Sequence, residues 1–286
     1  MSTQKFATQA LHAGHNVSEN GGTRAVPIYQ STAYVFNSSD HAANLFALAE
    51  PGNIYTRINN PTNDVLEQRL AALEGGIAAV VTASGTAAIA TSLLTLLKAG
   101  DHIVASSSLY GGTYNLLSVT LPRHGITTTF VDPSSAENFQ RAAQENTRAF
   151  FIESLGNPKL DVLDIEAISK EAKAYKLPLI VDNTVATPYL LNPIAYGANI
   201  VIQSLTKYIN GNGTALGGAI IDAGTFDWGS GKFPEFTEPS AGYHGLIYNE
   251  VIGAASFIAK VRIEGLRDYG AALSPFNAFQ IIQGLE

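Results

Sequence analysis

Short apolar runs alternate with segments of helical periodicity along most of this 286-residue chain. The helical segments carry apolar residues three and four positions apart, as Leu66, Leu70 and Leu73 do. We expect strands at residues 77–82, 102–105, 126–131, 149–153, 179–182 and 199–204, and helices at 62–74, 87–98, 136–145 and 165–175. Strands that alternate with helices need crossover connections. The sequence therefore predicts an α/β fold whose mainly parallel sheet is covered by helices on both faces.

Residues 75–97 carry no charge and form the one segment long and apolar enough to suggest a membrane span. Glycines and hydroxyl residues interrupt it repeatedly, which favours a buried strand, a turn at Ser84-Gly85-Thr86 and a buried helix. Thr62 is expected to cap the preceding helix, which Gly75 and Gly76 end. We predict no contact with a membrane.

Composition limits the classes of function. The sequence has no cysteine, so it has neither a disulfide framework nor a thiolate metal site, which fits the cytoplasm. A net charge of -7 argues against an extended nucleic-acid surface, because phosphate binding needs clustered Lys and Arg. Only 14% of the residues are charged. A surface with so little charge favours association with further copies of the chain.

Lys207 is the only charged residue between Asp182 and Asp222. Burial of an ammonium group favours loss of its proton, and a neutral lysine can form a Schiff base with a carbonyl. The alternative is a lysine whose side chain reaches the surface from a loop. Glycines at 211, 213, 217 and 218 follow it, as expected where the backbone approaches another group closely. We expect the amine of Lys207 to be held away from water.

Asp182 ends the apolar run Leu179-Ile-Val-Asp182, at the strand edge where open α/β sheets bind ligands, although it could instead cap a turn. The turn at residues 84–86 could bind an anion at a helix N-terminus, or could be an ordinary capped turn. Together with Lys207, these features match the carbonyl, ring nitrogen and phosphate of pyridoxal 5′-phosphate. His12 and His15 have no third ligand nearby in the sequence, so we predict no metal site.

Several strings together resemble the Cys/Met-metabolism group of pyridoxal-phosphate enzymes, and the resemblance covers nearly the whole chain. They are Asn53–Thr62, Leu109-Tyr110-Gly-Gly112, Val181-Asp182-Asn183-Thr184 and Ser204-Leu-Thr-Lys207-Tyr208. Within that group, Gln30–Phe36 and Phe233–Gly245 look like O-acetylhomoserine sulfhydrylases. The resemblance implies an aspartate-aminotransferase-like fold (fold type I). It also implies an N-terminal segment at 1–61 that contacts a neighbouring subunit, a large cofactor-binding domain at 62–265, and the start of a truncated C-terminal domain at 266–286.

The resemblance also implies a role for each matching residue. Lys207 would form the Schiff base and carry protons, and Tyr110 would stack on the ring and assist proton transfer. Asp182 would keep the ring nitrogen protonated, and Asn157 would contact the 3′ oxygen. The phosphate would be bound by Gly85, Thr86, Ser204 and Thr206, and by Tyr55 and Arg57 of a neighbouring subunit. The active unit would then be at least a dimer, with a tetramer favoured, and its active site would be shared between subunits.

The implied reaction is γ-replacement, in which a sulfur donor displaces acetate from O-acetyl-L-homoserine to give homocysteine. A cystathionine γ-synthase or γ-lyase on the same scaffold is an alternative. Methionine γ-lyases usually have a cysteine where this sequence has Gly112, which disfavours that activity. The arginine that holds the substrate carboxylate in the family has no match among these residues. A cofactor-binding fragment without turnover is therefore a further alternative.

Overall fold

The computed structural model, in which residues 4–286 are described, is built around a seven-stranded sheet ordered β1-β7-β6-β5-β4-β2-β3. Its strands are β1 (Ala78–Thr82), β2 (His102–Ser106), β3 (Thr127–Val131), β4 (Thr147–Glu153), β5 (Leu179–Asp182), β6 (Ile200–Gln203) and β7 (Gly218–Asp222). All neighbouring strands are parallel except β7, which is antiparallel to both β1 and β6. The sheet is therefore mainly parallel, as predicted, and β7 is a strand that the sequence analysis missed.

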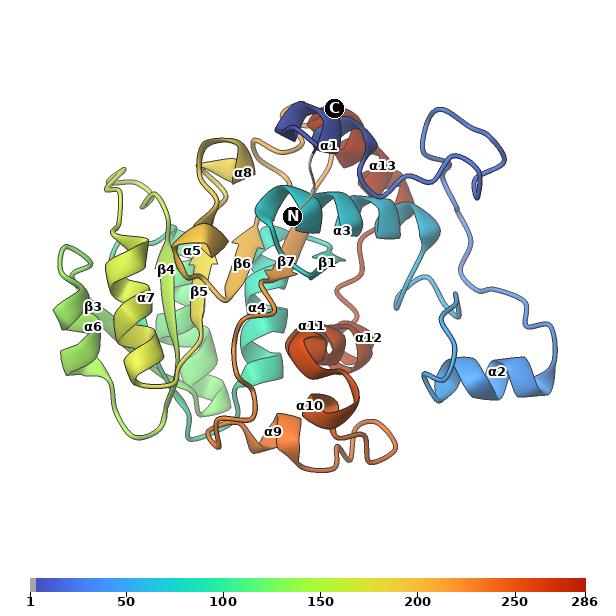
Figure 1. Cartoon of the computed structure of the whole chain (residues 1–286). Helices are drawn as coiled ribbons and strands as arrows, with labels where there is room; N and C mark the ends of the chain where they lie inside the picture. Colours follow the sequence, from blue (N-terminus) through green and yellow to red (C-terminus); the bar gives the residue numbers. More distant parts are fainter. Residues whose placement is uncertain (1–3) are drawn as a thin grey trace.

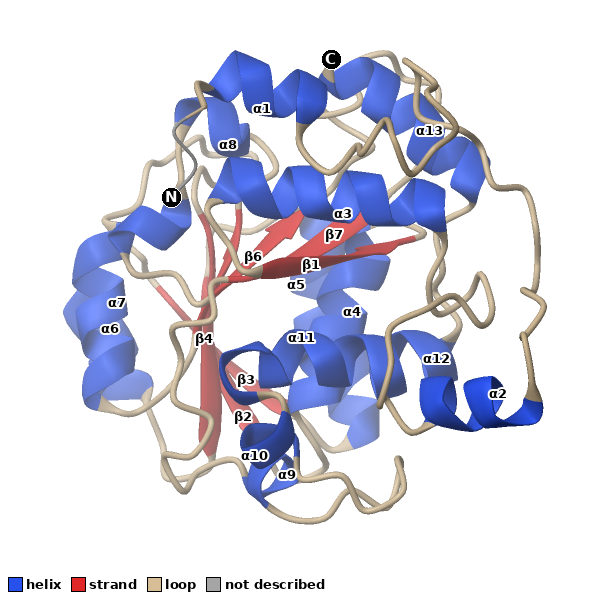
Figure 2. Cartoon of the chain, turned by 45° about the vertical axis from the view of Figure 1, so that its right-hand side comes forward, coloured by secondary structure: helices blue, strands red, loops and turns tan. Residues whose placement is uncertain are grey.

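Helices cover both faces of the sheet (Figure 2). One face is covered by α3 (Pro61–Glu74), α6 (Ala136–Ala142), α7 (Ile165–Ala174) and α13 (Pro275–Leu285), with α1 (Phe6–His12) and α8 (Thr187–Leu190) packed near α3. The other is covered by α4 (Gly85–Leu96), α11 (Ser256–Lys260) and the short helices α5 (Gly111–Asn115), α9 (Pro234–Thr237), α10 (Tyr248–Val251) and α12 (Arg267–Tyr269). This two-sided covering was predicted from the alternating pattern.

Alternate residues of each strand enter the two cores. In β4, Phe150 and Ile152 lie in the core that includes α3 and α7, whereas Phe151 lies in the core that includes α4. The second core also holds an aromatic group in which the Trp228 ring stacks on Phe257 at 5.3 Å between centroids. Both faces of the central strands are thus buried, which explains their continuous apolar sequences.

The N-terminal segment extends along the side of the molecule opposite α6 and α7, with α2 (Ser39–Phe46) at its far end (Figure 1). It is mostly irregular, as expected, and is tied to the body at Thr62. That hydroxyl donates to the Pro27 carbonyl at 2.8 Å and accepts from the Tyr29 N–H at 2.9 Å. Thr62 is therefore not the cap of α3. Asn60 is the cap, because Pro61 occupies the first helical position.

The uncharged stretch at residues 75–97 contains β1 and α4, joined by a turn that Ser84 caps through its hydroxyl. Gly75 ends α3 with a φ of 75°, in the left-handed region that favours glycine. Across residues 4–286, no helix combines the length and apolar character needed to span a lipid bilayer. The segment is therefore the buried strand, turn and helix that its interruptions predict.

Candidate active site

A cavity of about 640 Å³ lies at the carboxyl ends of β4, β5 and β6. The residues around it include all the predicted cofactor-binding residues except Tyr55 and Arg57. The complete set of residues that line the cavity is Ser84, Gly85, Thr86, Ile89, Tyr110, Thr113, Glu153, Leu155, Asn157, Asp182, Thr184, Val185, Ser204, Thr206, Lys207, Tyr208, Gly211, Gly213 and Leu216. The fold thus brings Tyr110, Asp182 and Lys207 to one cavity although they are far apart in the sequence.

Asp182 is fixed at the end of β5 by Thr184. The Thr184 hydroxyl donates to Asp182 Oδ1 at 2.5 Å, its N–H donates to the same oxygen at 3.0 Å, and the hydroxyl accepts from the Ser204 N–H at 2.8 Å. Burial raises the pKa of Asp182 above its usual range, and the two bonds from Thr184 act against that rise. Thr184 therefore links the ends of β5 and β6 and favours the charged form of the carboxyl.

Glu153 is a second carboxyl group at the same strand edge, and the sequence analysis did not single it out. It ends β4 in register with Asp182 and is 4% exposed. Its Oε1 accepts from the Tyr110 N–H at 2.6 Å and its Oε2 from the Asn157 N–H at 3.3 Å. Burial, and then the nearby Asp182 carboxylate, raise the pKa of Glu153 to about 8. The signal that picked out Asp182, an acid that ends an apolar strand, was present here too.

The N-terminus of α4 faces the cavity with the geometry of an anion site. Ser84 caps the helix, and the N–H groups of Gly85 and Thr86 in the first turn have no acceptor within the helix. An added Cβ on Gly85 would lie 2.6 Å from Ser204 Cβ and 2.9 Å from Ser204 Oγ. The helix start and the Ser204 hydroxyl therefore approach so closely that only glycine fits between them. This is a suitable place for a phosphate.

Thr206 lies on the cavity wall with its hydroxyl already engaged. That hydroxyl donates to the Gly217 carbonyl and accepts from the Gly217 N–H, both at 3.1 Å. Gly217 itself is tightly packed, since an added Cβ would lie 2.5 Å from Ile281 Cδ1. In this structure Thr206 holds the start of β7 against the turn that carries Lys207, and its donor must turn away from Gly217 to meet a phosphate oxygen.

Lys207 lines the cavity but is exposed, which contradicts the expectation that its amine lies away from water. The uncharged stretch around Lys207 includes the buried strand β6, but Lys207 itself lies in the turn that follows this strand. The Lys207 side chain itself stands where the cavity opens to solvent. Exclusion of water from this amine must therefore come from groups that bind in or over the cavity.

Tyr110 and Asn157 stand on loops that follow β2 and β4. The Tyr110 side chain is 53% exposed and packs against Gly112, where an added Cβ would lie 2.5 Å from Tyr110 Cε1. Asn157 is exposed and donates its N–H to Glu153. The Tyr110 ring is therefore free of protein contact over much of its surface, as a stacking partner for a planar ligand needs to be.

Tyr55 and Arg57 are not among the residues that line this cavity. The Arg57 guanidinium lies 5.4 Å from the centroid of the Tyr55 ring and donates to the Arg267 carbonyl. Tyr55 is 40% exposed. The structure thus pairs these two residues with each other, on the surface of the N-terminal segment and outside the chain's own cavity.

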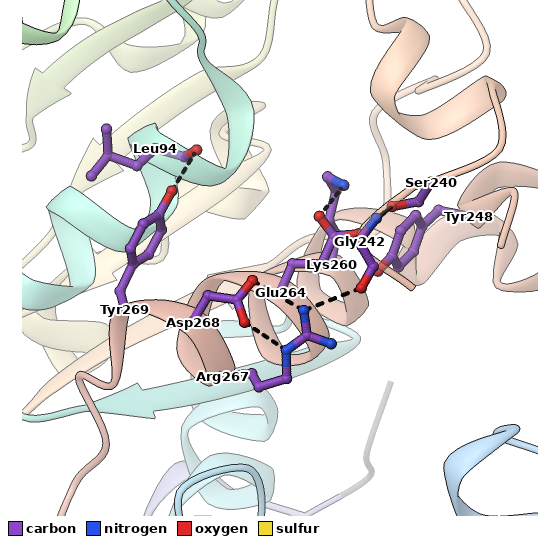
Figure 3. Close-up of polar contacts among 9 residues, drawn as sticks. All are labelled: Leu94, Ser240, Gly242, Tyr248, Lys260, Glu264, Arg267, Asp268 and Tyr269. Atoms are coloured by element: carbon purple, nitrogen blue, oxygen red, sulfur yellow. Dashed lines mark hydrogen bonds and ion pairs between the residues drawn. The ribbon is translucent and has the colours of Figure 1, made fainter. Parts of the chain in front are cut away.

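A polar cluster centred on α11, α12 and the π-helix between them (Val261–Leu266) supports the region next to Arg57 (Figure 3). Glu264 accepts from Lys260 at 2.7 Å, from Ser240 at 2.6 Å and from Tyr248 at 2.9 Å. Burial acts to raise the pKa of Glu264, but these three bonds outweigh it and leave the pKa below its ordinary value. Arg267 pairs with Asp268 and donates to the Gly242 carbonyl. The cluster therefore fixes both ends of the loop at residues 240–248.

The donor set of the cavity fits pyridoxal phosphate. It offers an amine at Lys207, a strand-end carboxylate at Asp182, and the N–H groups of a helix N-terminus close to the Ser204 hydroxyl. These are the groups that a carbonyl, a ring nitrogen and a phosphate require. Metal ligands do not gather comparably, because residues 4–286 contain no group of three or more His, Cys, Asp or Glu able to hold an ion.

Comparison with known proteins supports the same cofactor. Residues 7–286 match the family model described as Cys/Met metabolism PLP-dependent enzyme, where PLP is pyridoxal phosphate. The chain is 58% identical to an O-acetyl-L-homoserine sulfhydrylase of Leptospira meyeri, over 99% of this chain and 66% of that protein. It is 50% identical to a homocysteine synthase of Schizosaccharomyces pombe, over 99% of this chain and 67% of the relative.

Two solved structures have the same architecture. One, from Campylobacter jejuni, is provisionally described as an O-acetylhomoserine (thiol)-lyase and contains N′-pyridoxyl-lysine-5′-monophosphate. It superposes with a TM-score of 0.95 at 43% identity, over 99% of this chain and 70% of that one. The other, metB from Corynebacterium glutamicum, gives a TM-score of 0.80 at 32% identity, over 99% of this chain and 64% of that one. These matches confirm the expected fold type I architecture and the expected cofactor.

The chain spans about two thirds of the length of the curated relatives, 66% in the case of the Leptospira meyeri protein. The family model nevertheless matches from residue 7 to residue 286, through the sheet, the cavity and the loops that carry its polar groups. On this evidence the chain belongs to the Cys/Met metabolism PLP-dependent enzyme family.

Proposed function

We propose that this protein uses pyridoxal phosphate to replace the γ-acetoxy group of O-acetyl-L-homoserine with sulfur, giving homocysteine. The observation that carries the proposal is the shared cavity of Lys207, Asp182 and Tyr110 beside the N-terminus of α4. The relatives named O-acetyl-L-homoserine sulfhydrylase and homocysteine synthase support the choice of substrate and product. In the overall reaction with sulfide, the Cγ–O bond breaks, acetate leaves, and a Cγ–S bond forms.

When bound, pyridoxal phosphate supplies an electron sink next to the substrate Cα. The amine of Lys207 would hold the cofactor through its carbonyl and would move protons at Cα and Cβ of the substrate. Asp182 would hold a proton on the ring nitrogen, and its Thr184 bonds favour the charged carboxyl that this role needs. Tyr110 would stack on the ring and assist proton transfer. Asn157 would contact the 3′ oxygen.

The phosphate is held by the N–H groups of Gly85 and Thr86 and by the hydroxyls of Ser204 and Thr206. Because the Gly85 backbone nearly touches Ser204, these donors form one compact site at the start of α4. Asp182 and Lys207 line the same cavity at the strand ends and would hold the ring nitrogen and the carbonyl of the cofactor.

The experiment is a product assay on the purified chain supplied with pyridoxal phosphate and O-acetyl-L-homoserine. Mass spectrometry follows homocysteine with sulfide as donor and cystathionine with cysteine as donor. We expect homocysteine to form faster, and Lys207→Ala to abolish its formation. Faster cystathionine formation assigns a cystathionine γ-synthase activity instead. Bound cofactor with neither product supports the alternative of a cofactor-binding fragment without turnover.

Tyr55 and Arg57, in this proposal, reach the phosphate of a neighbouring copy, which makes residues 1–61 a subunit-contacting segment. Their place outside the chain's own cavity supports this role. Mixing Lys207→Ala with Arg57→Ala subunits tests it, because a mixed dimer contains one site with neither change. Random pairing restores about a quarter of wild-type activity. An inactive mixture contradicts the shared site, and light scattering of the wild type decides between a dimer and the favoured tetramer.

Two further expectations from the sequence concern the domain organisation and the location of the protein. The division into a cofactor-binding domain at 62–265 and a further domain that starts at 266 is a proposal. Limited proteolysis tests it, since cleavage is expected at the exposed Gly270, which ends the helical segment that contains residue 266, before the sheet is cut. The cytoplasmic location is also a proposal, which cell fractionation tests.

A further inference from the structure

Glu153 is a buried carboxyl group that lines the cavity, and the proposed reaction assigns no role to it. Among residues 4–286 no cation lies within ion-pair distance of it, and its carboxylate oxygens accept only backbone N–H groups. The two donors, Tyr110 and Asn157, belong to different loops. The Glu153 carboxylate is therefore a direct link between the loop after β2 and the loop after β4.

A buried carboxylate without a cation is costly, so packing alone does not explain its presence. Asp182, in register on the next strand, adds to the cost because two carboxylates at the same edge repel each other. Carbonyl oxygens or water could satisfy two backbone N–H groups without a buried charge. A single carboxylate does something that separate acceptors cannot, because it fixes both N–H groups relative to one rigid strand end.

We propose that Glu153 is a positioning residue whose carboxylate fixes the Tyr110 and Asn157 backbones so that both side chains meet the cofactor ring. This inference rests on the proposed function for the roles of Tyr110 and Asn157, and on the structure alone for the link between them. The side chain of Tyr110 is otherwise held mainly by its packing against Gly112. Without the bond to Glu153, the backbone that carries the Tyr110 ring is no longer fixed.

The link depends on the charge state of Glu153. A carboxylate accepts both N–H groups equally, whereas the protonated form offers one good acceptor oxygen and one weak one. The groups that face Glu153 are Asp182 on β5, Asp161 on the following loop and, across the cavity, Lys207. Burial and the Asp182 charge place the pKa of Glu153 at about 8. Binding of a cationic ring nitrogen at Asp182 removes part of that repulsion, so it favours the carboxylate and the intact link.

The first test needs no cofactor. Hydrogen exchange of the Tyr110 and Asn157 amides is measured at pH 9, where Glu153 is a carboxylate, in the wild type, in Glu153→Gln, in Glu153→Asp and in Glu145→Gln, an exposed glutamate before β4 that serves as control. A carboxamide has one acceptor oxygen, so Glu153→Gln should lower the protection factor of at least one of these amides by about tenfold. Glu145→Gln should leave both unchanged. Unchanged protection in Glu153→Gln overturns the proposal.

The second test uses pyridoxal phosphate and reads the circular dichroism of the bound cofactor band, which depends on how Tyr110 and Asn157 contact the ring. Glu153→Gln should shift this signal, and Glu153→Asp, which keeps the charge, should shift it less. An unchanged signal contradicts the positioning role. If the wild type binds no cofactor, the proposed function fails, while the amide exchange still decides whether the link exists.

If Glu153→Gln does not fold, the wild type alone decides. The protection factors of both amides should then rise as the pH passes from 7 to 9, across the pKa of about 8. Protection that is flat over this range contradicts the link, because amides bound to a group that does not titrate have no reason to follow that pKa.

Discussion

Glu74, the last residue of α3, is a buried carboxyl group whose raised pKa can be tested through the pH dependence of stability. Its side chain is fully buried, and Oε1 accepts from Gln203 at 2.5 Å and from Asn183 at 3.4 Å, while Oε2 has no partner among residues 4–286. Burial raises the pKa from 4.5 to about 7, against the effect of these two bonds. Gln203 precedes Ser204 and Asn183 follows Asp182 in the sequence, so the Glu74 carboxyl connects the ends of β5 and β6 next to the cavity.

The sign of the effect follows from the raised pKa. Between pH 4.5 and 7 the folded protein retains a proton that the unfolded chain releases, so stability falls as the pH rises through this window. The full difference corresponds to about 3 kcal/mol, and most of it is lost between pH 5 and 8. Glu74→Gln mimics the protonated form. It should match the wild type near pH 5 and exceed its free energy of unfolding by about 2–3 kcal/mol at pH 8.

Denaturant unfolding of the wild type, Glu74→Gln and the exposed control Glu137→Gln at pH 5, 6, 7 and 8 measures this difference. The other buried carboxyls titrate in all three proteins and cancel on subtraction. The control should follow the wild type at every pH. If Glu74→Gln loses stability with rising pH as steeply as the wild type does, the carboxyl is not buried as described and the reasoning fails.

Three further substitutions test other parts of the account. Gly85→Ala forces a Cβ into the phosphate-facing turn and should cost about 1–3 kcal/mol of stability and weaken pyridoxal phosphate binding. Gly111→Ala, whose added Cβ has no described atom within 4 Å, should cost far less stability. Equal effects of the two substitutions in a thermal melt and a binding titration would contradict the close approach at Gly85. Thr184→Val should raise the pKa of Asp182, so the ring nitrogen of the bound cofactor should lose its proton at a lower pH, as followed by the cofactor absorbance. Thr184→Ser should keep the pH dependence of the wild type, and identical pH titrations of the two variants would refute the hydroxyl's role. Lys260→Met removes a donor to Glu264, so it should lower the free energy of unfolding by about 1–3 kcal/mol and speed amide hydrogen exchange at residues 240–248. If neither the free energy of unfolding nor the exchange rates change, the cluster of Figure 3 does not support that loop.

The sequence predicted the sheet and its helices well wherever apolar pattern and glycine punctuation agreed. The strand at 179–182 and the left-handed end of α3 at Gly75 are examples. Strand β7 was missed because no element was assigned to the segment that contains the glycines at 211, 213, 217 and 218. The close backbone approach expected at these glycines is found at Gly218, where an added Cβ would lie 2.1 Å from the Ser84 carbonyl oxygen. Close approach between distant segments leaves the same sequence signal as a turn.

For the site, the sequence identified Lys207 and Asp182, and the fold places them around one cavity. The expected burial of Lys207 was wrong, because apolar neighbours in the sequence describe the strand and not the cavity into which a side chain projects. Glu153 escaped notice although it ends its strand as Asp182 does. Its partners are backbone groups of loops far away in the sequence, and no local pattern shows them.

The central claim is that the amine of Lys207 binds pyridoxal phosphate in the cavity beside Asp182. Borohydride reduction of the protein with the cofactor, followed by peptide mass mapping, tests it most directly because it locates the modified lysine. The account predicts a pyridoxyl group on the peptide that contains Lys207, and none after Lys207→Ala. An unmodified Lys207, or a pyridoxyl group on another lysine, would contradict it.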